Sequence, residues 1–388
     1  MNRKEIEAEL FDWMNEPESE LDAAADEDRF TRLALALFRF QYDACEPYTR
    51  LCRSLDRTPA NVLSVSEIPA VPTGAFKEFP LRSFPEEATI KIFRTSGTST
   101  DRRGELHLDT LDLYEASLLA SLRRCFVSDL VGQSAEMHFL APDITESPDS
   151  SLSHMFDALA RAEGGDGSRF DLIRGKLDLE AFEAAIHRAR AAESPLVVAG
   201  TSFAFVHFID EAVSASNPDA AEGRWALPAG SRIMETGGFK GRSRVVPRDA
   251  LRANIAACFG LDESRILNQY GMTELASQFY DSTLIDPEGP RRKLTAPWTR
   301  VRFVDPLSGN DVEAGEVGMI IIHDLANTGS VAAIQTSDLG RAILGAEGEM
   351  IGFDVLGREE GAEARGCSIA TDVMLDASSR IETGPGTR

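Results

Sequence analysis

The sequence has little positive charge and no long apolar run, and each shortage excludes a class of protein. Its 40 Lys and Arg residues face 63 Asp and Glu residues, which gives a formal net charge of −23. Such acidity argues against nucleic acid or an anionic membrane as a bulk partner. No apolar run approaches membrane-spanning length, and the charged, amphipathic N-terminus lacks the pattern of a signal peptide. We therefore expect a cytoplasmic protein with no nucleic acid and no membrane among its partners.

Cysteines and the common nucleotide signatures are also scarce. The five cysteines are scattered, odd in number and without C-x-x-C spacing, which fits a reducing compartment better than a disulfide framework or a zinc site. The Walker pattern G-x-x-x-x-G-K-[ST] is absent. The glycine-rich run at 164–168 lacks the G-x-G-x-x-G fingerprint of dinucleotide folds. Any nucleotide site in this chain therefore uses other motifs.

The chain of 388 residues is long enough for two domains. Apolar residues at helical spacing predict two or three helices in an N-terminal cap and lead-in, 1–85. Alternating strand and helix patterns predict an α/β core with a mostly parallel sheet over 86–290. Short strands separated by Gly, Asn and Asp turns predict a small β-rich subdomain over 291–355, followed by a short C-terminal segment, 356–388.

Three polar loops, 95–104, 235–242 and 268–274, each follow a predicted strand. Because ligand sites of parallel α/β sheets lie beyond the carboxyl ends of the strands, we expect all three loops at one edge. The third loop belongs to the stretch 266–279, whose pattern predicts a strand, a glycine-bearing turn and then a helix.

The loop 95–104 is rich in hydroxyl groups and ends in two arginines. Its hydroxyls, exposed N–H groups and Gly97 can hold phosphate oxygens, with Arg102 or Arg103 supplying charge. The alternative is a solvated Ser/Thr turn.

The loop 268–274 offers other ligand-binding groups. Tyr270 has a flat face for a base, Gly271 allows close approach of a ligand, and Thr273 and Glu274 add a hydroxyl and a carboxylate. The alternative is an ordinary strand–helix connection with a helix-starting Thr and a first-turn Glu.

Four motifs in order resemble those of the adenylate-forming superfamily of acyl- and aminoacyl-activating enzymes. They are the Ser/Thr/Gly phosphate loop, Y-G-x-T-E, T-[SG]-D and G-R, found here at 95–100, 270–274, 336–338 and 357–358. Each motif alone is weak, but four in the expected order are a strong signal.

Within that superfamily the chain is similar to the acyl-protein synthetases of bacterial luminescence fatty-acid reductase complexes, and phenylacetate-CoA ligases are a more distant relation. The likeness covers most of the chain and rests on the stretches VPTGAFKEFP, TGGFKGR, NQYGMTEL, PWTRVR, TSDLG and GAEARGCS. It implies an adenylate-forming large domain with parallel sheets and helices, a β-rich subdomain and a truncated C-terminal lid.

The resemblance implies ATP and Mg²⁺ as cofactors. Thr273 then contacts the α-phosphate, and Glu274 is the Mg²⁺ ligand, which suits a metal that prefers oxygen. Arg102 or Arg103 replaces the usual loop lysine beside the β- and γ-phosphates. The phosphate-loop residues themselves are Thr95, Ser96, Gly97, Thr98, Ser99 and Thr100.

The same resemblance implies the nucleoside contacts. Tyr270, beside Gly271, stacks on adenine against the backbone of Gly237 and Gly238. Asp338 accepts hydrogen bonds from both ribose hydroxyls, and Arg358 contacts the ribose or a phosphate as a catalytic group.

The acid substrate is implied to bind along an apolar helix at 201–213 and a buried strand. The lining residues are His138, Gly200 and Phe203. A core histidine is the alternative for His138, because one His does not decide between the two. The apolar helix favours an aliphatic or aromatic acyl chain.

The implied reaction is attack of a carboxylate on the α-phosphorus of ATP, which gives acyl-AMP, followed by transfer of the acyl group to a thiol. Cys367 matches the acyl-carrying cysteine of the luminescence synthetases, and Arg365 nearby favours its thiolate. The alternatives are a packed structural cysteine with CoA or a carrier-protein thiol as acceptor, or a non-catalytic subunit that binds a nucleotide or an acyl group. An acyl-reductase, an acyl-transferase or a carrier protein is the expected partner. No lid lysine can be placed after 357–358.

Overall fold

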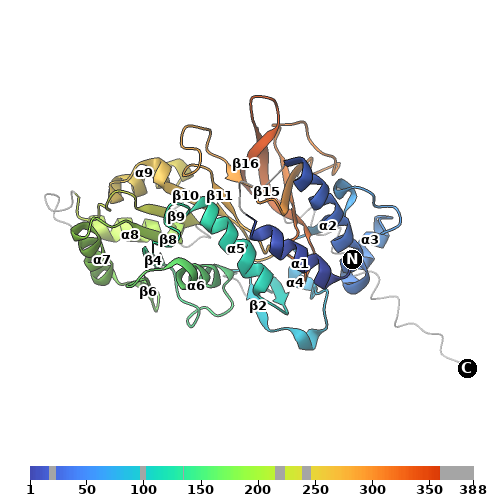
Figure 1. Ribbon diagram of the computed structural model, residues 1–388, viewed down its shortest axis with the longest axis horizontal. Coiled ribbons are helices and arrows are strands. Elements are labelled where there is room, and N and C mark those ends of the chain that lie inside the picture. Colours follow the sequence, from blue (N-terminus) through green and yellow to red (C-terminus); the bar gives the residue numbers. More distant parts are fainter. Residues whose placement is uncertain (17–22, 97–101, 134, 215–222, 238–245, 359–388) are drawn as a thin grey trace, which may run out of the picture. The chain divides into compact units, whose positions relative to one another are not determined.

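The computed structural model describes residues 1–16, 23–96, 102–133, 135–214, 223–237 and 246–358 (Figure 1). It divides into two compact units, each built from separate stretches of the chain. The first contains Met1–Leu118, Met272–Ser277 and the chain from Leu294 onward, and the second contains Leu119–Gly271 and Gln278–Lys293. The four domain segments predicted from the sequence remain a prediction. They cannot be compared directly with the two compact units, because each unit combines stretches that are far apart in the sequence.

Two or three N-terminal helices were predicted, and the described residues of the first unit contain three: α1 Arg3–Met14, α2 Ala23–Ala44 and α3 Glu46–Ser54. Asn2 begins α1 by accepting a hydrogen bond from the Glu5 N–H at 3.1 Å, and the Glu5 carboxylate accepts from the Asn2 N–H at 2.9 Å. Gln41 on α2 is buried, and its side chain donates to the Asn327 carbonyl at 2.9 Å and the Thr328 carbonyl at 3.4 Å and accepts from the Ala332 N–H at 2.9 Å. These bonds fix the helices to the chain just before β15.

The predicted β-rich subdomain is an antiparallel sheet in the order β13-β14-β15-β16, in which β1 also pairs with β15 in parallel. Every residue of β14 is buried, and Val304, Met319 and Ile321 form a small core. The strands are β1 Val71–Pro72, β13 Thr299–Val304, β14 Gly318–Asp324, β15 Ala333–Leu344 and β16 Met350–Arg358.

The hydroxyl-rich loop belongs to a separate hairpin of the first unit. Strand β2 Lys91–Arg94 pairs with β3 Glu105–Leu108 in an antiparallel two-stranded sheet. The prediction that all three loops follow strands of one parallel sheet is therefore wrong for this loop. The two strands that flank the loop are short and pair with each other, with the buried Phe93 directly opposite the buried Leu106. An antiparallel hairpin forms between strands that are close in sequence, so these strands need no partner in the parallel sheet.

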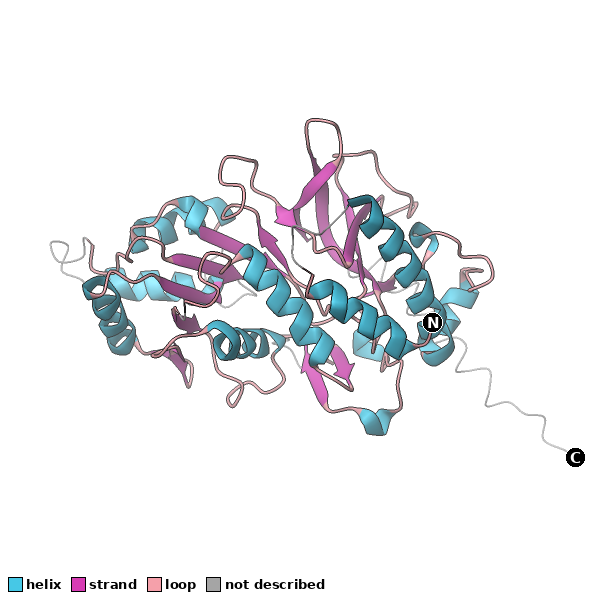
Figure 2. Cartoon of the chain, viewed as in Figure 1, coloured by secondary structure: helices cyan, strands magenta, loops and turns pink. Residues whose placement is uncertain are grey.

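The predicted parallel sheet forms the second unit, with the strand order β11-β10-β9-β8-β4-β5. Strand β11 runs antiparallel to β10, and the other neighbours are parallel. The strands are β4 Glu136–Leu140, β5 Arg169–Phe170, β8 Leu196–Thr201, β9 Arg232–Thr236, β10 Ile266–Tyr270 and β11 Phe279–Asp281. The α/β fold class is confirmed (Figure 2).

Helices cover both faces of this sheet. Phe182 of α7, Phe205 of α8 and Phe259 of α9 share one hydrophobic core with strand residues such as Val198 and Ile233. On the other face Phe156 of α6 stacks on Phe139 of β4, with 5.0 Å between ring centroids. Burial on both faces is typical of parallel sheets. The helices are α6 Ser151–Glu163, α7 Leu179–Ala191, α8 Ser202–Ser214 and α9 Arg248–Phe259; the remaining elements are α4 Ala75–Glu78, α5 Asp112–Cys125, β6 Leu172–Ile173, β7 Lys176–Leu177 and β12 Lys293–Leu294.

The helix predicted after the turn at 268–274 is absent. No helix starts between β10 and β11, and the backbone finds other partners instead. The Ala276 and Ser277 N–H groups both donate to Asp324 Oδ2, at 2.8 and 2.7 Å, and Asn327 Nδ2 donates to the Glu274 carbonyl at 2.9 Å. These tertiary hydrogen bonds replace the i to i−4 bonds that a helix needs, so the local prediction is wrong.

In the part of the chain that the structure describes, no helix combines the length and the apolar character needed to cross a bilayer.

Candidate functional site

Two of the three predicted loops follow neighbouring strands of the second unit. Glu235 on β9 is in register with Gly200 on β8 and with Asn268 on β10. The loops that start at Thr236 and Tyr270 therefore leave the same edge of the parallel sheet, where α/β folds bind ligands. The prediction is confirmed for this pair of loops.

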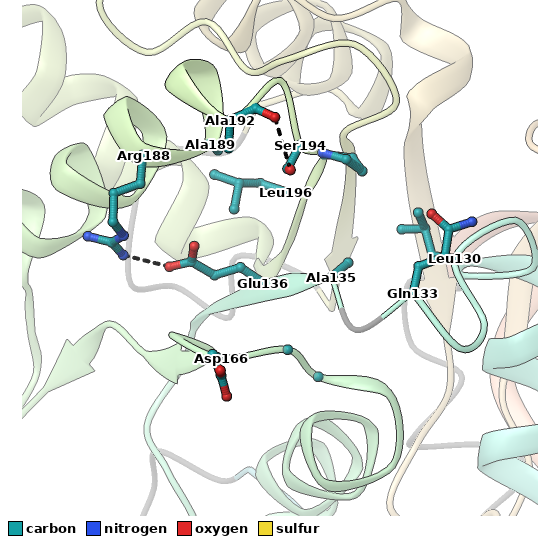
Figure 3. Close-up of a pocket in the computed structure, with 13 residues that line it drawn as sticks. Leu130, Gln133, Ala135, Glu136, Asp166, Arg188, Ala189, Ala192, Ser194 and Leu196 are labelled. Atoms are coloured by element: carbon teal, nitrogen blue, oxygen red, sulfur yellow. Dashed lines mark hydrogen bonds and ion pairs between the residues drawn. The ribbon is translucent and has the colours of Figure 1, made fainter.

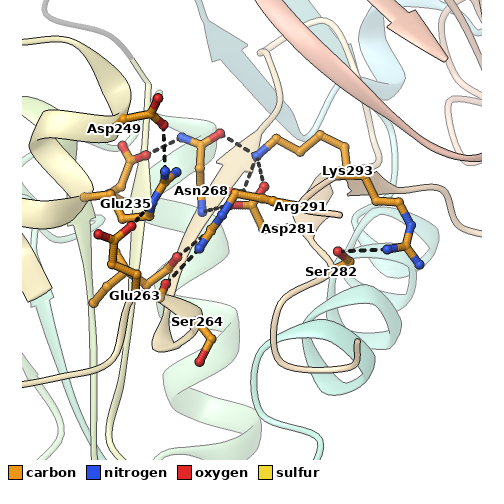
Figure 4. Close-up of polar contacts among 12 residues, drawn as sticks. Glu235, Asp249, Glu263, Ser264, Asn268, Asp281, Ser282, Arg291 and Lys293 are labelled. Atoms are coloured by element: carbon orange, nitrogen blue, oxygen red, sulfur yellow. Dashed lines mark hydrogen bonds and ion pairs between the residues drawn. The ribbon is translucent and has the colours of Figure 1, made fainter. Parts of the chain in front are cut away.

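A buried polar network, not predicted from the sequence, lies beneath this edge (Figure 4). Lys293 Nζ donates to the Asn268 carbonyl at 2.6 Å and to Asp281 Oδ1 at 2.9 Å, and Arg291 Nη1 donates to Asp281 Oδ2 at 2.6 Å. Burial lowers the pKa of Lys293, and the Asp281 carboxylate opposes that effect. Burial alone favours a higher pKa for Asp281, but the charges of Lys293 and Arg291 outweigh it and lower the pKa. Lys293 and Asp281 carry no motif, so only the fold could bring them together.

Tyr270 and Gly271 are the residues of the Y-G-M-T-E motif that belong to the second unit. The Tyr270 ring is half-buried and lies 6.2 Å from the Phe279 ring. A Cβ atom at Gly271 would lie 2.5 Å from Gln269 Nε2, so a larger residue here would displace the end of the Gln269 side chain. Gly237 has a φ of +79°, which favours glycine as well. Their contacts to adenine remain a prediction, and Gly238 lies outside the described residues.

The motif continues into the first unit with Thr273 and Glu274. Glu274 is 7% exposed, and its segment is held by the Asp324 and Asn327 bonds described above. A carboxylate on a fixed backbone is a suitable Mg²⁺ ligand when phosphate oxygens and water supply the rest of the shell. No described residues form a cluster of three or more His, Cys, Asp or Glu side chains suited to a metal. Within the Y-G-M-T-E motif, Glu274 is the carboxylate offered to a nucleotide-bound metal.

The structure brings Asp338 and Arg358 together within the first unit. They are directly opposite each other on β15 and β16, with 3.7 Å between Arg358 Nε and Asp338 Oδ1. The Arg358 side chain is 71% exposed, whereas the Asp338 side chain is 19% exposed. Gly357 has a φ of +125° at the end of this strand. The resemblance implies that Asp338 accepts hydrogen bonds from the ribose diol and that Arg358 contacts the ribose or a phosphate. An exposed guanidinium beside a carboxylate suits these two roles.

The hydroxyl-rich loop is closed at its base by Thr95. The Thr95 N–H donates to the Gly104 carbonyl, and the Gly104 N–H donates to Thr95 Oγ1, both at 2.9 Å. Arg102 is exposed and lies 3.4 Å from Glu78, while Arg103 is half-buried. Ser96 follows Thr95 in the loop. The other residues of the loop that are predicted to contact phosphate lie outside the described residues: Gly97, Thr98, Ser99 and Thr100.

The three residues predicted to line the acid pocket lie in the second unit. His138 is fully buried, and its ring nitrogens contact Asp171 Oδ2 at 2.7 Å and Glu136 Oε1 at 3.1 Å. These contacts describe the core histidine that the sequence left as an alternative. Gly200 packs so closely on β4 that a Cβ would lie 2.8 Å from Leu140 Cβ, and Phe203 is half-buried on α8. Contact with a substrate remains a prediction for all three.

A cavity of about 550 Å³ lies elsewhere in the second unit, at the amino-terminal ends of β4 and β8 (Figure 3). Its lining includes Asp166 and the ion pair between Arg188 and Glu136, whose atoms are 2.6 Å apart. None of the predicted site residues lines it. Because ligands of parallel α/β sheets bind at the opposite strand ends, we place the functional site at the loop edge.

Solved structures with the same architecture define the class of the fold. A 2-hydroxyisobutyryl-CoA ligase in complex with 2-HIB-AMP and CoA superimposes with a TM-score of 0.61 at 14% identity, over 87% of this chain and 69% of that chain. The same ligase with R3-HIB-AMP also gives a TM-score of 0.61 at 14% identity, over 89% of this chain and 72% of that chain. The fold is that of the adenylate-forming ligases.

Sequence comparison identifies the family. The model of the acyl-protein synthetase, LuxE family matches residues 167–376, which is more than half of the 388 residues. The chain belongs to the acyl-protein synthetase, LuxE family. A long-chain-fatty-acid–luciferin-component ligase of Aliivibrio fischeri is 24% identical over 315 residues, covering 80% of this chain and 78% of the relative. The ligase of the same name from Vibrio harveyi is 20% identical over 353 residues, covering 90% of this chain and 89% of the relative. The predicted family and the predicted ligase class are confirmed.

Proposed function

We propose that the chain uses ATP and Mg²⁺ to activate a long-chain fatty acid, or another apolar carboxylic acid, and passes the acyl group to a thiol. The family match over residues 167–376 carries this proposal, because that range contains the Y-G-M-T-E and T-S-D motifs. The names of the two relatives support a long-chain fatty acid as the substrate.

The first step joins the acid to AMP. A carboxylate oxygen of the substrate forms a bond to the α-phosphorus of ATP, the bond from that phosphorus to the β-phosphate bridge breaks, and pyrophosphate leaves. Asp338 holds the ribose hydroxyls, Thr273 donates to an α-phosphate oxygen and Arg358 supplies positive charge. Catalysis comes from positioning and from stabilising charge on the phosphoryl oxygens. Mg²⁺ bound to Glu274 would neutralise the phosphates.

The second step transfers the acyl group. A thiolate attacks the carbonyl carbon of acyl-AMP, the mixed anhydride bond breaks, and AMP leaves with the electron pair. We propose Cys367, which lies outside the described residues, as the attacking thiol, on its match to the acyl-carrying cysteine of related synthetases. An acyl-reductase, an acyl-transferase or a carrier protein then takes the acyl group from the thioester.

We propose a reducing cytoplasm as the compartment. Among the described residues, Cys45, Cys52 and Cys258 are free thiols. Burial raises the pKa of Cys45 to about 11 and that of Cys258 to about 11, so these thiols are poor nucleophiles at neutral pH. We therefore do not expect the acyl group on Cys45 or Cys258.

The test has two stages. Pyrophosphate exchange into ATP, measured with a panel of acids of increasing chain length, should respond most strongly to long-chain fatty acids. The protein is then supplied with ATP, Mg²⁺ and the best acid, and the thioester is mapped by mass spectrometry. Cys367→Ser should still form the adenylate but no longer retain a hydroxylamine-labile acyl group, whereas the control Cys258→Ser should retain it.

Each stage can fail separately. No exchange with any acid would overturn the adenylation proposal. Exchange with an acyl group that stays on the Cys367→Ser protein, or that moves only to added CoA, would remove Cys367 as acceptor and favour a CoA ligase.

A further inference from the structure

Glu235 lies where three segments of the predicted site in the second unit meet (Figure 4). It is on β9, it contacts Ser202 at the first residue of α8, and it contacts Asn268 on β10. The side chain is buried, with 8% of the residue exposed. The adenylation steps described above assign it no role.

The hydrogen bonds of Lys293 determine which way the side-chain amide of Asn268 points. The three protons of the ammonium group have three acceptors in the network: the Asn268 carbonyl at 2.6 Å, Asn268 Oδ1, and Asp281 Oδ1 at 2.9 Å. With Oδ1 facing the ammonium, Asn268 Nδ2 faces Glu235 and donates to Oε1 at 2.5 Å. Oε1 of Glu235 is therefore the accepting oxygen.

The other carboxyl oxygen meets a hydroxyl that has only one proton. Ser202 Oγ lies within hydrogen-bond distance of Glu235 Oε2, of the Gly237 carbonyl at 2.8 Å and of the Thr236 carbonyl at 3.3 Å. A serine hydroxyl donates once and accepts through its lone pairs. If Ser202 donates to Gly237, its contact with Oε2 is satisfied when Oε2 carries a proton and donates to Ser202.

The charges that face Glu235 come from three elements. Burial raises the pKa of its carboxyl group, and the Asp281 carboxylate on β11 acts in the same direction. The hydrogen bonds from Ser202 and Asn268 and the charge of Lys293 on β12 act in the opposite direction, but burial outweighs them. Arg291 neutralises Asp281 from the loop before β12, and Arg248 of α9 acts on Lys293.

We propose that Glu235 is a positioning residue that works as a neutral carboxylic acid. It accepts from Asn268 and donates to Ser202, and Ser202 donates to the Gly237 carbonyl. This chain of hydrogen bonds ties the start of the acid-pocket helix to the backbone predicted to face adenine. Its effect on turnover rests on the proposed adenylation activity.

Loss of the proton reverses one link of this chain. An ionised carboxylate has only acceptors, so Ser202 turns its proton to Glu235 and the Gly237 carbonyl loses its donor. The start of α8 and the Gly237 backbone then hold their positions less well. Glutamine reproduces the neutral acid, because its oxygen accepts from Asn268 and its NH₂ group donates to Ser202.

The kinetic test compares Glu235→Gln and Glu235→Ala with the unmodified protein, measuring pyrophosphate exchange from about pH 6 to about pH 9. Glu235→Gln should stay within about twofold of the unmodified protein in KM for ATP near neutral pH, and remain flat at higher pH. The unmodified protein should show a rise of about tenfold towards alkaline pH, and Glu235→Ala should be raised throughout. The exposed control Glu180→Gln should follow the unmodified protein.

Two kinetic results would overturn the proposal. A Glu235→Gln protein as impaired as Glu235→Ala at every pH would show that an ionised carboxylate is needed. An alkaline rise that persists in Glu235→Gln would assign the titration to another group.

An infrared spectrum tests the protonation without any turnover. The C=O stretching band of a neutral carboxylic acid should weaken in Glu235→Gln relative to the unmodified protein at neutral pH, and should be unchanged in Glu180→Gln. A C=O band in Glu235→Gln identical to that of the unmodified protein would contradict the proposal. If the band weakens as expected but no acid supports pyrophosphate exchange, the adenylation proposal fails and the protonation of Glu235 stands.

Discussion

Two acidic side chains of the first unit differ in how the protein holds them, and this difference fits different ligands. Glu274 is buried on a segment whose backbone is bound by Asp324 and Asn327. Asp338 lies on a strand beside the exposed Arg358. A carboxylate with a fixed position suits a metal ion with strict geometry, whereas a carboxylate beside an exposed cation suits a ribose with a neighbouring phosphate. The two carboxylates therefore differ in how the surrounding protein holds them.

Glu274→Gln and Asp338→Ala should each lower the rate of pyrophosphate exchange by about a hundredfold or more, since each removes a group expected at the transition state. Thermal unfolding should remain within a few degrees of the unmodified protein for Asp338→Ala, because that side chain is partly exposed. The exposed control Glu316→Gln should keep full activity. Near-normal exchange in either folded variant would withdraw the corresponding assignment.

At the scale of elements, the loop 95–104 closes a two-stranded hairpin and is not part of the parallel sheet. Thr95 forms the base of the loop through its backbone and its hydroxyl, so the nearest hydroxyl already has a structural partner. Arg102 is exposed next to Glu78, so solvent screens the charge of its guanidinium group. The cations that this loop offers to a phosphate are Arg102 and Arg103.

The double variant Arg102→Ala, Arg103→Ala should raise the KM for ATP by about tenfold and change the KM for the acid much less, because a cation at the loop end balances phosphate charge. Initial rates of pyrophosphate exchange at varied ATP and varied acid measure the two constants. The pair Arg39→Ala, Arg57→Ala removes two exposed arginines of the same unit as a control. An unchanged dependence on ATP would show that neither loop arginine contacts the phosphates.

Across the whole molecule, stability depends on groups that are buried without charge. His323 on β14 is 1% exposed, and burial, with the nearby charge of Arg302, lowers its pKa to about 3 from the ordinary value of 6.5. The folded protein thus keeps this imidazole neutral, whereas the unfolded chain takes up the proton below about pH 6.5. The contribution of His323 to stability is complete above that pH and is lost as the pH falls towards 3.

The free energy of unfolding should therefore fall by up to about 1.4 kcal/mol per pH unit from this one group between about pH 6 and about pH 4. Denaturant unfolding of the unmodified protein and of His323→Leu at several pH values isolates the term, because carboxyl groups titrate in both. The variant should lose less stability than the unmodified protein over this range, and the exposed control His187→Gln should behave like the unmodified protein. Parallel losses in His323→Leu and the unmodified protein would contradict the assignment.

The sequence by itself determined the order of elements and the type of chemistry. Periodicity and strand–helix alternation are local properties, so the N-terminal helices, the parallel strands and the β-rich strands were all predictable. The four motifs at 95–100, 270–274, 336–338 and 357–358 indicated the ligase class through their resemblance, in order, to those of the adenylate-forming superfamily. The family match confirmed that class.

Only the tertiary structure decided which polar groups act together. Asp324 replaced a predicted helix after β10 by binding two N–H groups of Ala276 and Ser277 from a distant part of the sequence. Lys293 and Asp281 met Asn268 and Glu235 because β10 lies between β9 and β11. Such partners are chosen by burial, since a polar group removed from water must find a hydrogen bond wherever the packed chain supplies one. No local pattern records that choice.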